Sequence, residues 1–507
     1  MDSRYFLAGF ALYLLIMIGI SYLVSRRQSS SEDFLLAGRK VSGGLTFGTT
    51  VATMIGTGTS MGAVGFAYTH GWSGMLYGIG GAIGILLAAW WFAPLRQMRF
   101  MTMSEELSYY VGANIWVKNG SAILIFLASL GWLGAHIIGG ALYLSWATGL
   151  EMLYAKLLIA LAFTFYVMIG GYKAVIWTDS LMAIVLFSGF LLMSYSAVEA
   201  VGGLDLVWQS VADAQNTGQM KQMELLPAIS LSAVVAVGVL ATPSFRQRIY
   251  SGRSVRSVRR SFVFAGLLYL LFAALPALIG ISARLLAPDL TNHQFAFTTV
   301  AVMTLPVVFA MLVLLAGLSA TLSSASSDSI AAVSVLIRDL YQSVTGSMPE
   351  AKSAIFYSRI AVMLVSVLAL LLALMSNDLI RYITGMIATL MSGMFVIALL
   401  GRFWPRLTWQ GALAALMGAL LTSAVILNHP SWLTFWGNPC LPALAVSLSL
   451  ASIVSLLSKP SDISREQALQ IITMQREGTP DAVQANVSET INQPQLSRPY
   501  LSNLFKQ

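Results

Sequence analysis

The chain has 507 residues, of which 57% are hydrophobic and only 10% are charged, and its mean hydropathy is +0.76. Soluble domains carry about 25% charged residues, so this composition excludes a soluble enzyme or a large soluble domain. The net charge of +8 does not indicate a nucleic-acid partner, because its meaning depends on where the basic residues lie. The composition therefore predicts an all-α polytopic membrane protein.

Apolar stretches recur along the chain, and thirteen of them are long enough, or nearly so, to cross a bilayer as a helix. They are residues 5–25, 43–68, 73–95, 119–149, 153–170, 179–200, 226–244, 261–283, 298–337, 355–376, 380–401, 408–427 and 438–457. The first has no basic flank or small-residue cleavage site and is predicted to be a retained helix. The polar tail, 459–507, is predicted to be cytoplasmic and largely disordered, with one short helix near 464–475.

The basic residues predict the orientation. Of the 29 Lys and Arg residues, 24 fall in one set of alternate loops or in the tail. The other five are Arg4, Lys156, Lys221, Arg284 and Arg381. The positive-inside rule then places the N-terminus outside and the C-terminus in the cytoplasm. The six arginines of 246–260 are interpreted as part of this topology signal, in a loop without a catalytic role. The single cysteine, Cys440, excludes an intramolecular disulfide.

The stretch 43–68 has four glycines within ten residues, Gly56, Gly58, Gly62 and Gly65. Glycine weakens a helix interior, and irregular backbone at membrane depth persists only where it is buried in protein or lines a cavity. Hydroxyl residues alternate with these glycines, which favours a broken helix of the kind that forms transporter binding sites. The alternative is close packing mediated by the glycines.

Two further stretches place polar groups at membrane depth. Asp179 is expected to open the helix 179–200, either as an N-terminal carboxylate or, if deeper, as a functional group, with Lys173 as a candidate partner. Ala320, Ser323, Ser324 and Ser327 share one stripe of the span 298–337. Oxygen atoms on one stripe suit a small hard cation, whereas the alternative is a small-residue face for helix packing.

Three motifs in this order resemble the sodium:solute symporter family, and the resemblance covers about residues 5–457. They are Asp33-Phe34-Leu35-Leu36-Ala37-Gly38-Arg39, the stretch Gly170–Asp179 and the stretch Ala320–Ser327. The resemblance implies a leucine-transporter-like core of two inverted five-helix repeats, 43–200 and 226–401, in which the first helix of each repeat is broken. Residues 1–42 and 402–458 would then hold helices outside that core.

The resemblance also implies Na⁺ as the coupling ion. Its first sodium site would use the carbonyl oxygens of Ala52, Ile55 and Ala320 with the hydroxyls of Ser323 and Ser324. Some members have a second site, whose equivalents here are Asp179, Ser326 and Ser327. Members that carry a single ion can retain this carboxylate, so the motif leaves one or two sodium ions open.

The solute is expected between the broken helix and its neighbours. The candidate binding residues are Thr57, Thr59, Ser60, Tyr77, Trp132, His136 and Thr242. Trp132 and His136 share a helix face, but helix packing and an interhelical hydrogen bond explain them equally well. The stretches at which relatives that carry sugars have carboxylates and amides are here glycine-rich or apolar, and the span 119–149 lacks the arginine of the sialic-acid type.

The stretch 243–248 resembles the choline-transporter branch, although Thr242 and Leu76 replace two of its aromatic residues. The predicted function is therefore sodium-coupled symport of a small organic solute: a monocarboxylate, an amino acid, a vitamin-like acid or a quaternary amine. The protein is expected to act as a monomer in the bacterial inner membrane. The alternative is a membrane sensor that uses the transporter fold. An enzyme is not expected, because no nucleophile–base pair or phosphate loop is evident.

Overall fold

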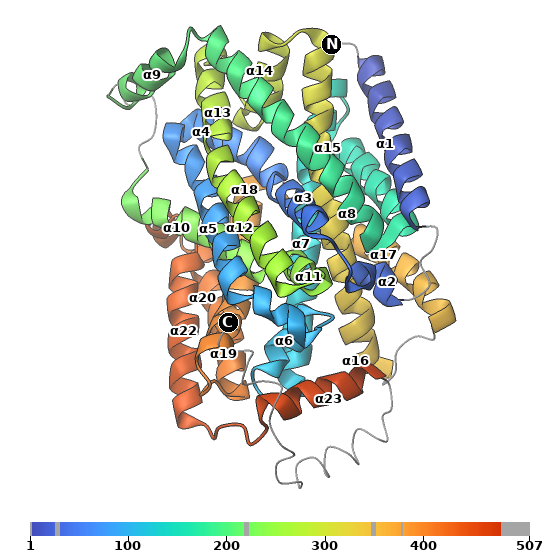
Figure 1. The fold of residues 1–507 in the computed structure, drawn as a ribbon. Coiled ribbons are helices and arrows are strands. Elements are labelled where there is room, and N and C mark those ends of the chain that lie inside the picture. Colours follow the sequence, from blue (N-terminus) through green and yellow to red (C-terminus); the bar gives the residue numbers. More distant parts are fainter. Residues whose placement is uncertain (1–2, 26–30, 217–222, 346–350, 377–378, 478–507) are drawn as a thin grey trace.

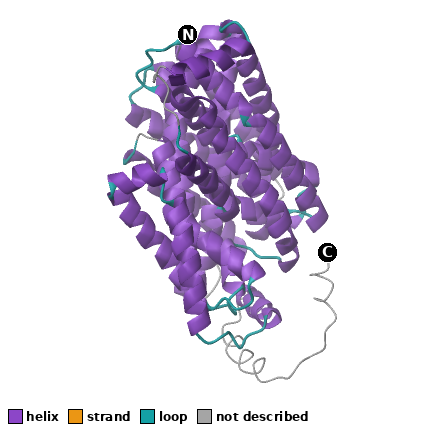
Figure 2. Ribbon diagram, turned by 90° about the vertical axis from the view of Figure 1, so that its left-hand side faces the viewer, coloured by secondary structure: helices purple, strands orange, loops and turns teal. Residues whose placement is uncertain are grey.

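The computed structural model describes residues 3–25, 31–216, 223–345, 351–376 and 379–477, which form a bundle of helices (Figures 1 and 2). The only β pairing within these ranges is an isolated bridge between Val41 and Gly252. The prediction of an all-α protein is therefore confirmed. The part of the tail predicted to be disordered, 478–507, lies outside the described residues.

The helices divide into long spans and short connecting segments. In chain order they are α1 (Ser3–Ser25), α2 (Ser31–Leu36), α3 (Gly43–Met54), α4 (Val64–His70), α5 (Met75–Trp91), α6 (Met103–Tyr109), α7 (Ile115–Thr148), α8 (Met152–Ala200), α9 (Leu204–Asn216), α10 (Leu225–Ala241), α11 (Pro243–Ser251), α12 (Val255–Phe272), α13 (Ala274–Leu286), α14 (Ala296–Thr304), α15 (Val307–Val335), α16 (Gln342–Thr345), α17 (Ala351–Leu374), α18 (Leu379–Met386), α19 (Ser392–Phe403), α20 (Trp409–Asn428), α21 (Pro430–Trp436), α22 (Cys440–Leu457) and α23 (Arg465–Glu477).

Within the described ranges, ten helical runs are long and apolar enough to cross a membrane, or eleven if the bent pair α10–α11 is one span. The predicted number of thirteen spans is therefore not confirmed. Residues 58–91 are helical with one interruption at Gly71 (φ 59°, ψ −131°), which separates α4 from α5, so the two spans expected there meet at a turn. The expected span 153–170 overlaps a shorter apolar helix, Met152–Phe165. Hydropathy marks apolar composition and cannot show where a helix bends or continues.

Three backbone breaks interrupt these spans. The helix α3 ends at Met54, and a π-helical segment, η2 (Gly58–Ala63), resumes after Ile55 and Gly56, as the glycines predicted. Thr242 adopts an extended conformation (φ −74°, ψ 126°) and separates α10 from α11 at an angle of 44°. Both broken helices are thus present.

The third break lies within α8, where Gly171 has φ 56° and ψ −168°. A Cβ at this position would lie 2.8 Å from Phe34 Cδ2, so a residue without a side chain is needed both for the conformation and for the contact. The helical run continues from there through Asp179, which is fully buried. The expectation that Asp179 opens its helix is therefore wrong: the helix restarts about two turns earlier.

Packing in the centre joins segments that are far apart in the sequence. The helix α15 packs against α7 and α8, α3 packs against α8 and α12, and α5 packs against α10 and α12. The outer helix α1 packs on α8 and exposes Leu12, Leu15 and Leu23 on its other side, as expected for a helix that contacts lipid.

The interpretation of residues 246–260 as a loop is wrong. Residues 243–251 form the helix α11, and the side chains of Arg246 and Arg248 are each only 1% exposed. Arg246 lies 3.0 Å from Glu106 of α6, and Arg248 lies 3.4 Å from Asp179 of α8. Buried charges persist in an apolar surrounding only when they are paired, and such pairing is invisible to a count of basic residues.

The predicted tail helix is present as α23, close to its expected range. It packs against α6 at one end of the molecule, opposite to the end that carries α9 and α14 (Figure 1). Arg476 Nη2 donates to Glu105 Oε2 at 2.6 Å, and Arg465 Nη2 donates to the carbonyl oxygen of Gly401 at 2.6 Å. The helix is therefore part of the folded transmembrane unit.

Candidate transport site

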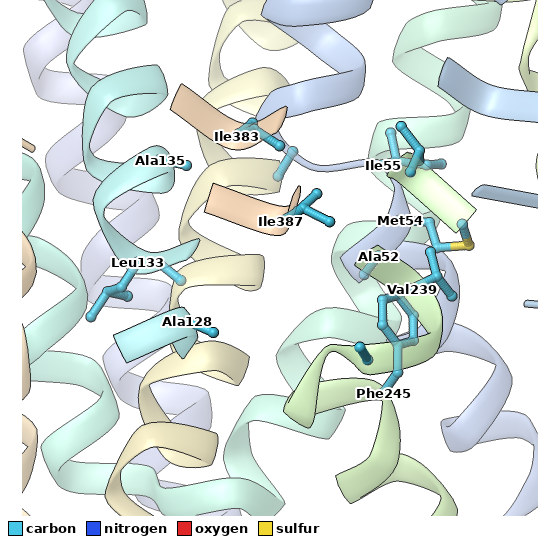
Figure 3. Close-up of a cluster of buried hydrophobic side chains, with 14 of the residues drawn as sticks. Ala52, Met54, Ile55, Ala128, Leu133, Ala135, Val239, Phe245, Ile383 and Ile387 are labelled. Atoms are coloured by element: carbon cyan, nitrogen blue, oxygen red, sulfur yellow. The ribbon is translucent and has the colours of Figure 1, made fainter. Parts of the chain in front are cut away.

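A cavity lies where the two broken helices face α5, α7, α12 and α15. The space between its walls that no atom fills is about 550 Å³, part of which is open to solvent. The lining residues are Thr53, Met54, Gly56, Thr57, Gly58, Thr59, Tyr77, Gly81, Trp132, His136, Val235, Gly238, Val239, Thr242, Ser244, Phe245, Tyr269, Asp328 and Ile387. Figure 3 shows the Ile387 side chain pointing from its helix toward Met54, Val239 and Phe245.

Six of the seven residues predicted to bind solute line this cavity: Thr57, Thr59, Tyr77, Trp132, His136 and Thr242. Ser60 does not, and its hydroxyl instead donates to the carbonyl oxygen of Gly56 at 3.2 Å. The structure thus brings together residues from four separate spans. Whether they bind the solute remains a prediction.

Several lining side chains hold one another in place. Trp132 Nε1 donates to Thr242 Oγ1 at 3.1 Å, which links α7 to the break between α10 and α11. The hydroxyls of Thr59 and Tyr269 are 2.7 Å apart, and Thr59 Oγ1 also donates to the carbonyl oxygen of Met54 at 2.8 Å. Hydrogen bonds of this kind satisfy groups that the break in the backbone leaves free.

Glycine allows close contacts at the cavity wall, so the packing interpretation also holds for part of this segment. A Cβ at Gly58 would lie 2.1 Å from Tyr77 Oη, and a Cβ at Gly62 would lie 2.5 Å from Ile380 Cδ1. The break in the helix lies just before Gly58, at Ile55 and Gly56. The glycines therefore serve both the irregular backbone and the close approach of its neighbours.

A buried contact between a histidine and a carboxylate forms one side of the cavity. His136 Nε2 of α7 lies 3.0 Å from Asp328 Oδ2 of α15, and the two side chains are 6% and 5% exposed. Thr57 Oγ1 lies 3.2 Å from His136 Nδ1 and 3.1 Å from Thr321 Oγ1. The Trp132 ring stacks on the imidazole with centroids 6.2 Å apart.

The sequence interpretation missed Asp328 as a site residue. The signal was available: Asp328 follows Ser324 by four residues and Thr321 by seven, so it continues a polar stripe of α15. An ionisable residue within a membrane span is a functional candidate by default. Tyr269 and Phe245 were also missed, because nothing in their local sequence distinguishes a cavity wall from ordinary packing.

Some of the residues expected to bind the first sodium ion lie together, around the end of α3. No hydrogen bond from a described residue reaches the carbonyl oxygens of Ala52 and Ile55, because α3 ends at Met54. Across from them on α15, Ser324 Oγ donates to the neighbouring carbonyl oxygen of Thr53 at 3.4 Å. Ala320, Ser323 and Ser324 are at most 1% exposed. Free carbonyls opposite buried hydroxyls provide the neutral oxygen ligands that a small hard cation prefers.

Asp179 lies beside this group and has four neighbours. Its Oδ1 accepts from Ser323 Oγ at 2.5 Å, and its Oδ2 accepts from Thr49 Oγ1 at 2.6 Å, Ser327 Oγ at 3.2 Å and Arg248 Nη2 at 3.4 Å. Ser326, expected in the second sodium site, instead donates to the carbonyl oxygen of Ser323 at 2.7 Å. The basic partner of Asp179 is thus Arg248 rather than Lys173.

Comparison with known proteins agrees with this geometry. The sequence model of the "Sodium:solute symporter family" matches residues 34–419, well over half of the chain. The chain belongs to this family. It is 25% identical over 455 residues to the sodium/pantothenate symporter of Escherichia coli (strain K12), covering 86% of this chain and 93% of the relative. The sodium/pantothenate symporter of Haemophilus influenzae is 23% identical over 461 residues, with the same coverage of both chains.

Solved structures show the same fold for this symporter. A substrate-bound, outward-open Na⁺-coupled sialic acid symporter matches with a TM-score of 0.78 at 20% identity, covering 91% of this chain and 98% of the other. The nucleobase-cation-symport-1 family transporter Mhp1 matches with a TM-score of 0.57 at 14% identity, covering 88% and 99%. The protein is therefore a multi-pass membrane transporter of a bacterial symporter family, and Na⁺ is its coupling ion.

Proposed function

We propose that the protein imports a small organic solute together with Na⁺ by alternating access, with the solute bound in the cavity between the broken helices. The observation that carries this proposal is the pair of free carbonyl oxygens at Ala52 and Ile55. They lie at the end of α3, next to the buried hydroxyls of α15 and directly beside the cavity. Sodium bound there would join the broken helix to α15, so ion binding and the shape of the cavity would be coupled.

Ser323 contributes to this site through its position between the ion and Asp179. Its hydroxyl proton is donated to Asp179 Oδ1, which leaves the oxygen lone pairs free for a cation. The carboxylate thereby adds negative potential next to the sodium ligands without being one of them.

We further propose that a single sodium ion is carried. The position beside Asp179 where a second cation would bind is taken by the guanidinium of Arg248, which also donates to Ser327 Oγ at 2.8 Å. Arginine stays charged at any accessible pH, so it serves as a permanent counter-ion for Asp179. Asp179, Ser326 and Ser327 then have a structural role and do not form a second sodium site.

The orientation and repeat assignments belong to the same proposal. The end of the molecule with α6 and α23 would face the cytoplasm and the end with α9 and α14 would face outward, which places the C-terminus inside. Residues 43–200 and 226–401 would be the two inverted repeats, and one copy would be functional in the inner membrane. The single cysteine, Cys440, is buried, so a cysteine introduced at the exposed Glu199 or Glu466 can be labelled selectively. In intact cells, a membrane-impermeant thiol reagent should label the cysteine at position 199 and not the one at position 466.

The decisive experiment is uptake by proteoliposomes with and without a sodium gradient, for the wild type and Ser323→Ala. We expect gradient-driven uptake in the wild type and a strongly weakened sodium dependence in the variant, which keeps its fold because the substitution removes only one hydroxyl. Ser329→Ala is the matched control, since Ser329 is equally buried on α15 and makes no hydrogen bond with a described residue.

Two outcomes would contradict the proposal. Unchanged sodium stimulation in Ser323→Ala would remove the assigned ion site. Solute binding without any gradient-driven uptake in the wild type would instead favour a membrane sensor built on the transporter fold.

A further inference from the structure

We propose that the solute is an organic cation with a protonated amine, which is bound by the carboxylate of Asp328 at the wall of the central cavity. This inference rests on the proposed function, because it assigns the chemistry of the same solute site. Its basis is the charge of the lining, the free oxygen of Asp328 and the aromatic residues around it.

The ionisable lining favours a positive solute. Within the described part of the chain, the ionisable residues that line the cavity, apart from tyrosines, are Asp328 and His136, and no Lys or Arg is among them. Arg248 of α11 lies behind the cavity wall, 5.7 Å from the centroid of the Phe245 ring, and its guanidinium donates to Asp179, Thr53, Ser327 and the carbonyl oxygen of Ser244. A carboxylate solute would therefore be placed next to the Asp328 carboxylate, with no lysine or arginine among the described lining residues to receive it.

One carboxylate oxygen of Asp328 contacts His136, and the other is available to a ligand. Oδ2 is the atom 3.0 Å from His136 Nε2. Among the described residues, none forms a hydrogen bond with Oδ1. This atom is also absent from the set of fully buried polar atoms without a partner, so it retains some accessible surface. The side chain is nevertheless almost completely buried, with the whole residue 3% exposed. An acceptor in such a place is suited to an ammonium N–H, which forms charge-assisted hydrogen bonds.

The imidazole of His136 positions this carboxylate. It is held by Thr57 on one side and by Asp328 on the other, and Trp132 stacks on its face. Thr57 belongs to the broken helix, so the orientation of Asp328 depends on the segment that is also proposed to bind sodium. This connection gives a physical route by which sodium would increase the affinity for the solute.

Aromatic residues complete the lining. Tyr77, Trp132, Phe245 and Tyr269 come from four different helices and all line the same space. Aromatic faces attract cations, and the attraction is larger at desolvated sites. A carboxylate facing aromatic walls therefore forms a site for a compact amine with an apolar body.

The test is a thermal-stability screen of the purified protein in Na⁺ and in K⁺ with matched solutes. Butylamine and phenethylamine are the cationic probes, butyrate and phenylacetate are their anionic counterparts, and butanol is the neutral one. We expect the amines alone to stabilise the wild type, and to do so more strongly in Na⁺. In Asp328→Asn the apparent affinity for the amines should fall about 10- to 100-fold, as expected for the loss of a hydrogen bond to a charged group.

Asp205→Asn is the control, because Asp205 is exposed on α9 far from the cavity lining, and it should keep the wild-type affinity. Stabilisation by the anions, or silence of both amines, would overturn the inference. The inference would also be overturned if Asp328→Asn changed the affinity for sodium and left amine binding intact, because Asp328 would then bind the ion and not the solute. If Asp328→Asn does not fold, the wild-type panel and Asp328→Glu decide.

The failure of this inference is separable from the failure of the proposed function. A sodium-dependent stabilisation without any amine effect would keep the symport proposal and reject the amine. Absence of any sodium effect would reject sodium coupling whatever the solute.

Discussion

Arg246 and Arg248 lie two residues apart on α11, are equally buried, and point to different sides of the helix. Arg246 lies 3.0 Å from Glu106 and stacks 3.4 Å from the centroid of the Phe92 ring. Arg248 contacts Asp179, together with the hydroxyls of Thr53 and Ser327. The two pairs use the same chemistry in different surroundings.

The surroundings indicate two roles. Glu106 accepts from Tyr250 and Tyr110, and burial raises its pKa although Arg246 and the tyrosines oppose the shift. None of these groups lines the central cavity. Asp179 instead bonds to Ser323 and Ser327 on α15, beside the proposed sodium ligands. We infer that the first pair stabilises the end of the fold that carries α6 and α23, and that the second sets the charge at the proposed ion site.

The largest effect is expected from Arg246→Ala. It leaves Glu106 buried without its basic partner, and the free energy of unfolding should fall by about 3–5 kcal/mol. Thermal or denaturant unfolding in detergent measures this. The double variant Arg246→Met with Glu106→Gln should recover most of the loss, because no unpaired charge remains. Equal instability of the single and double variants would contradict a coupled pair.

Arg248→Gln should affect transport more than stability. Asp179 keeps three hydroxyl donors in this variant, so the free energy of unfolding should fall by about 1–3 kcal/mol, less than for Arg246→Ala. Uptake should fall about 10-fold or more, and the Hill coefficient for sodium should rise if a second ion replaces the guanidinium. The exposed Arg253→Gln is the matched control. A Hill coefficient equal to that of the wild type would argue against Arg248 as a substitute for an ion.

A third pair tests whether exposure sets the size of these effects. Arg476 of α23 is bonded to Glu105, but its side chain is 16% exposed, far more than that of Arg246. Arg476→Ala should therefore lower the free energy of unfolding by only about 1 kcal/mol. It should also increase amide hydrogen exchange in α23, while the cavity-lining segments keep their protection. Loss of protection throughout the protein would show that α23 is more tightly coupled than the contacts indicate.

The pH dependence of this third pair should be the smallest effect. Burial acts to raise the pKa of Glu105, but Arg476 and the amide of Met101 outweigh it, and the pKa is lowered. A carboxyl group with a lowered pKa stabilises the fold at pH values above its unfolded pKa, about 4.3. That stability is lost as the pH falls through the folded pKa. Hydrogen exchange of α23 should thus stay constant near neutral pH and rise only under more acidic conditions.

The parts of the fold that depend on local composition were predictable from the sequence. Glycine density marked the break at Ile55 and Gly56, and the spacing of hydroxyls marked the buried stripe of α15. The short tail helix predicted near 464–475 is observed as α23. These features depend on residues within about two turns of one another, which a sequence displays directly.

The parts that depend on distant partners were not predictable. The arginines of α11 appeared as topology signals, because Glu106 and Asp179 are distant in the chain. Asp179 was assigned to a helix start, because an apolar run does not show that the helix begins at Gly171. Asp328 was overlooked although it continues the serine stripe, since its significance emerges only when His136 and the cavity are seen beside it.

The position of α23 has a practical consequence for protein engineering. Hydropathy alone would end the folded unit at Leu457, and a truncation or fusion designed on that basis would remove Arg465 and Arg476. Glu105 and the carbonyl oxygen of Gly401 would then lose their partners. A fluorescent fusion or an affinity tag is better joined after Glu477, where it leaves this helix in place against α6.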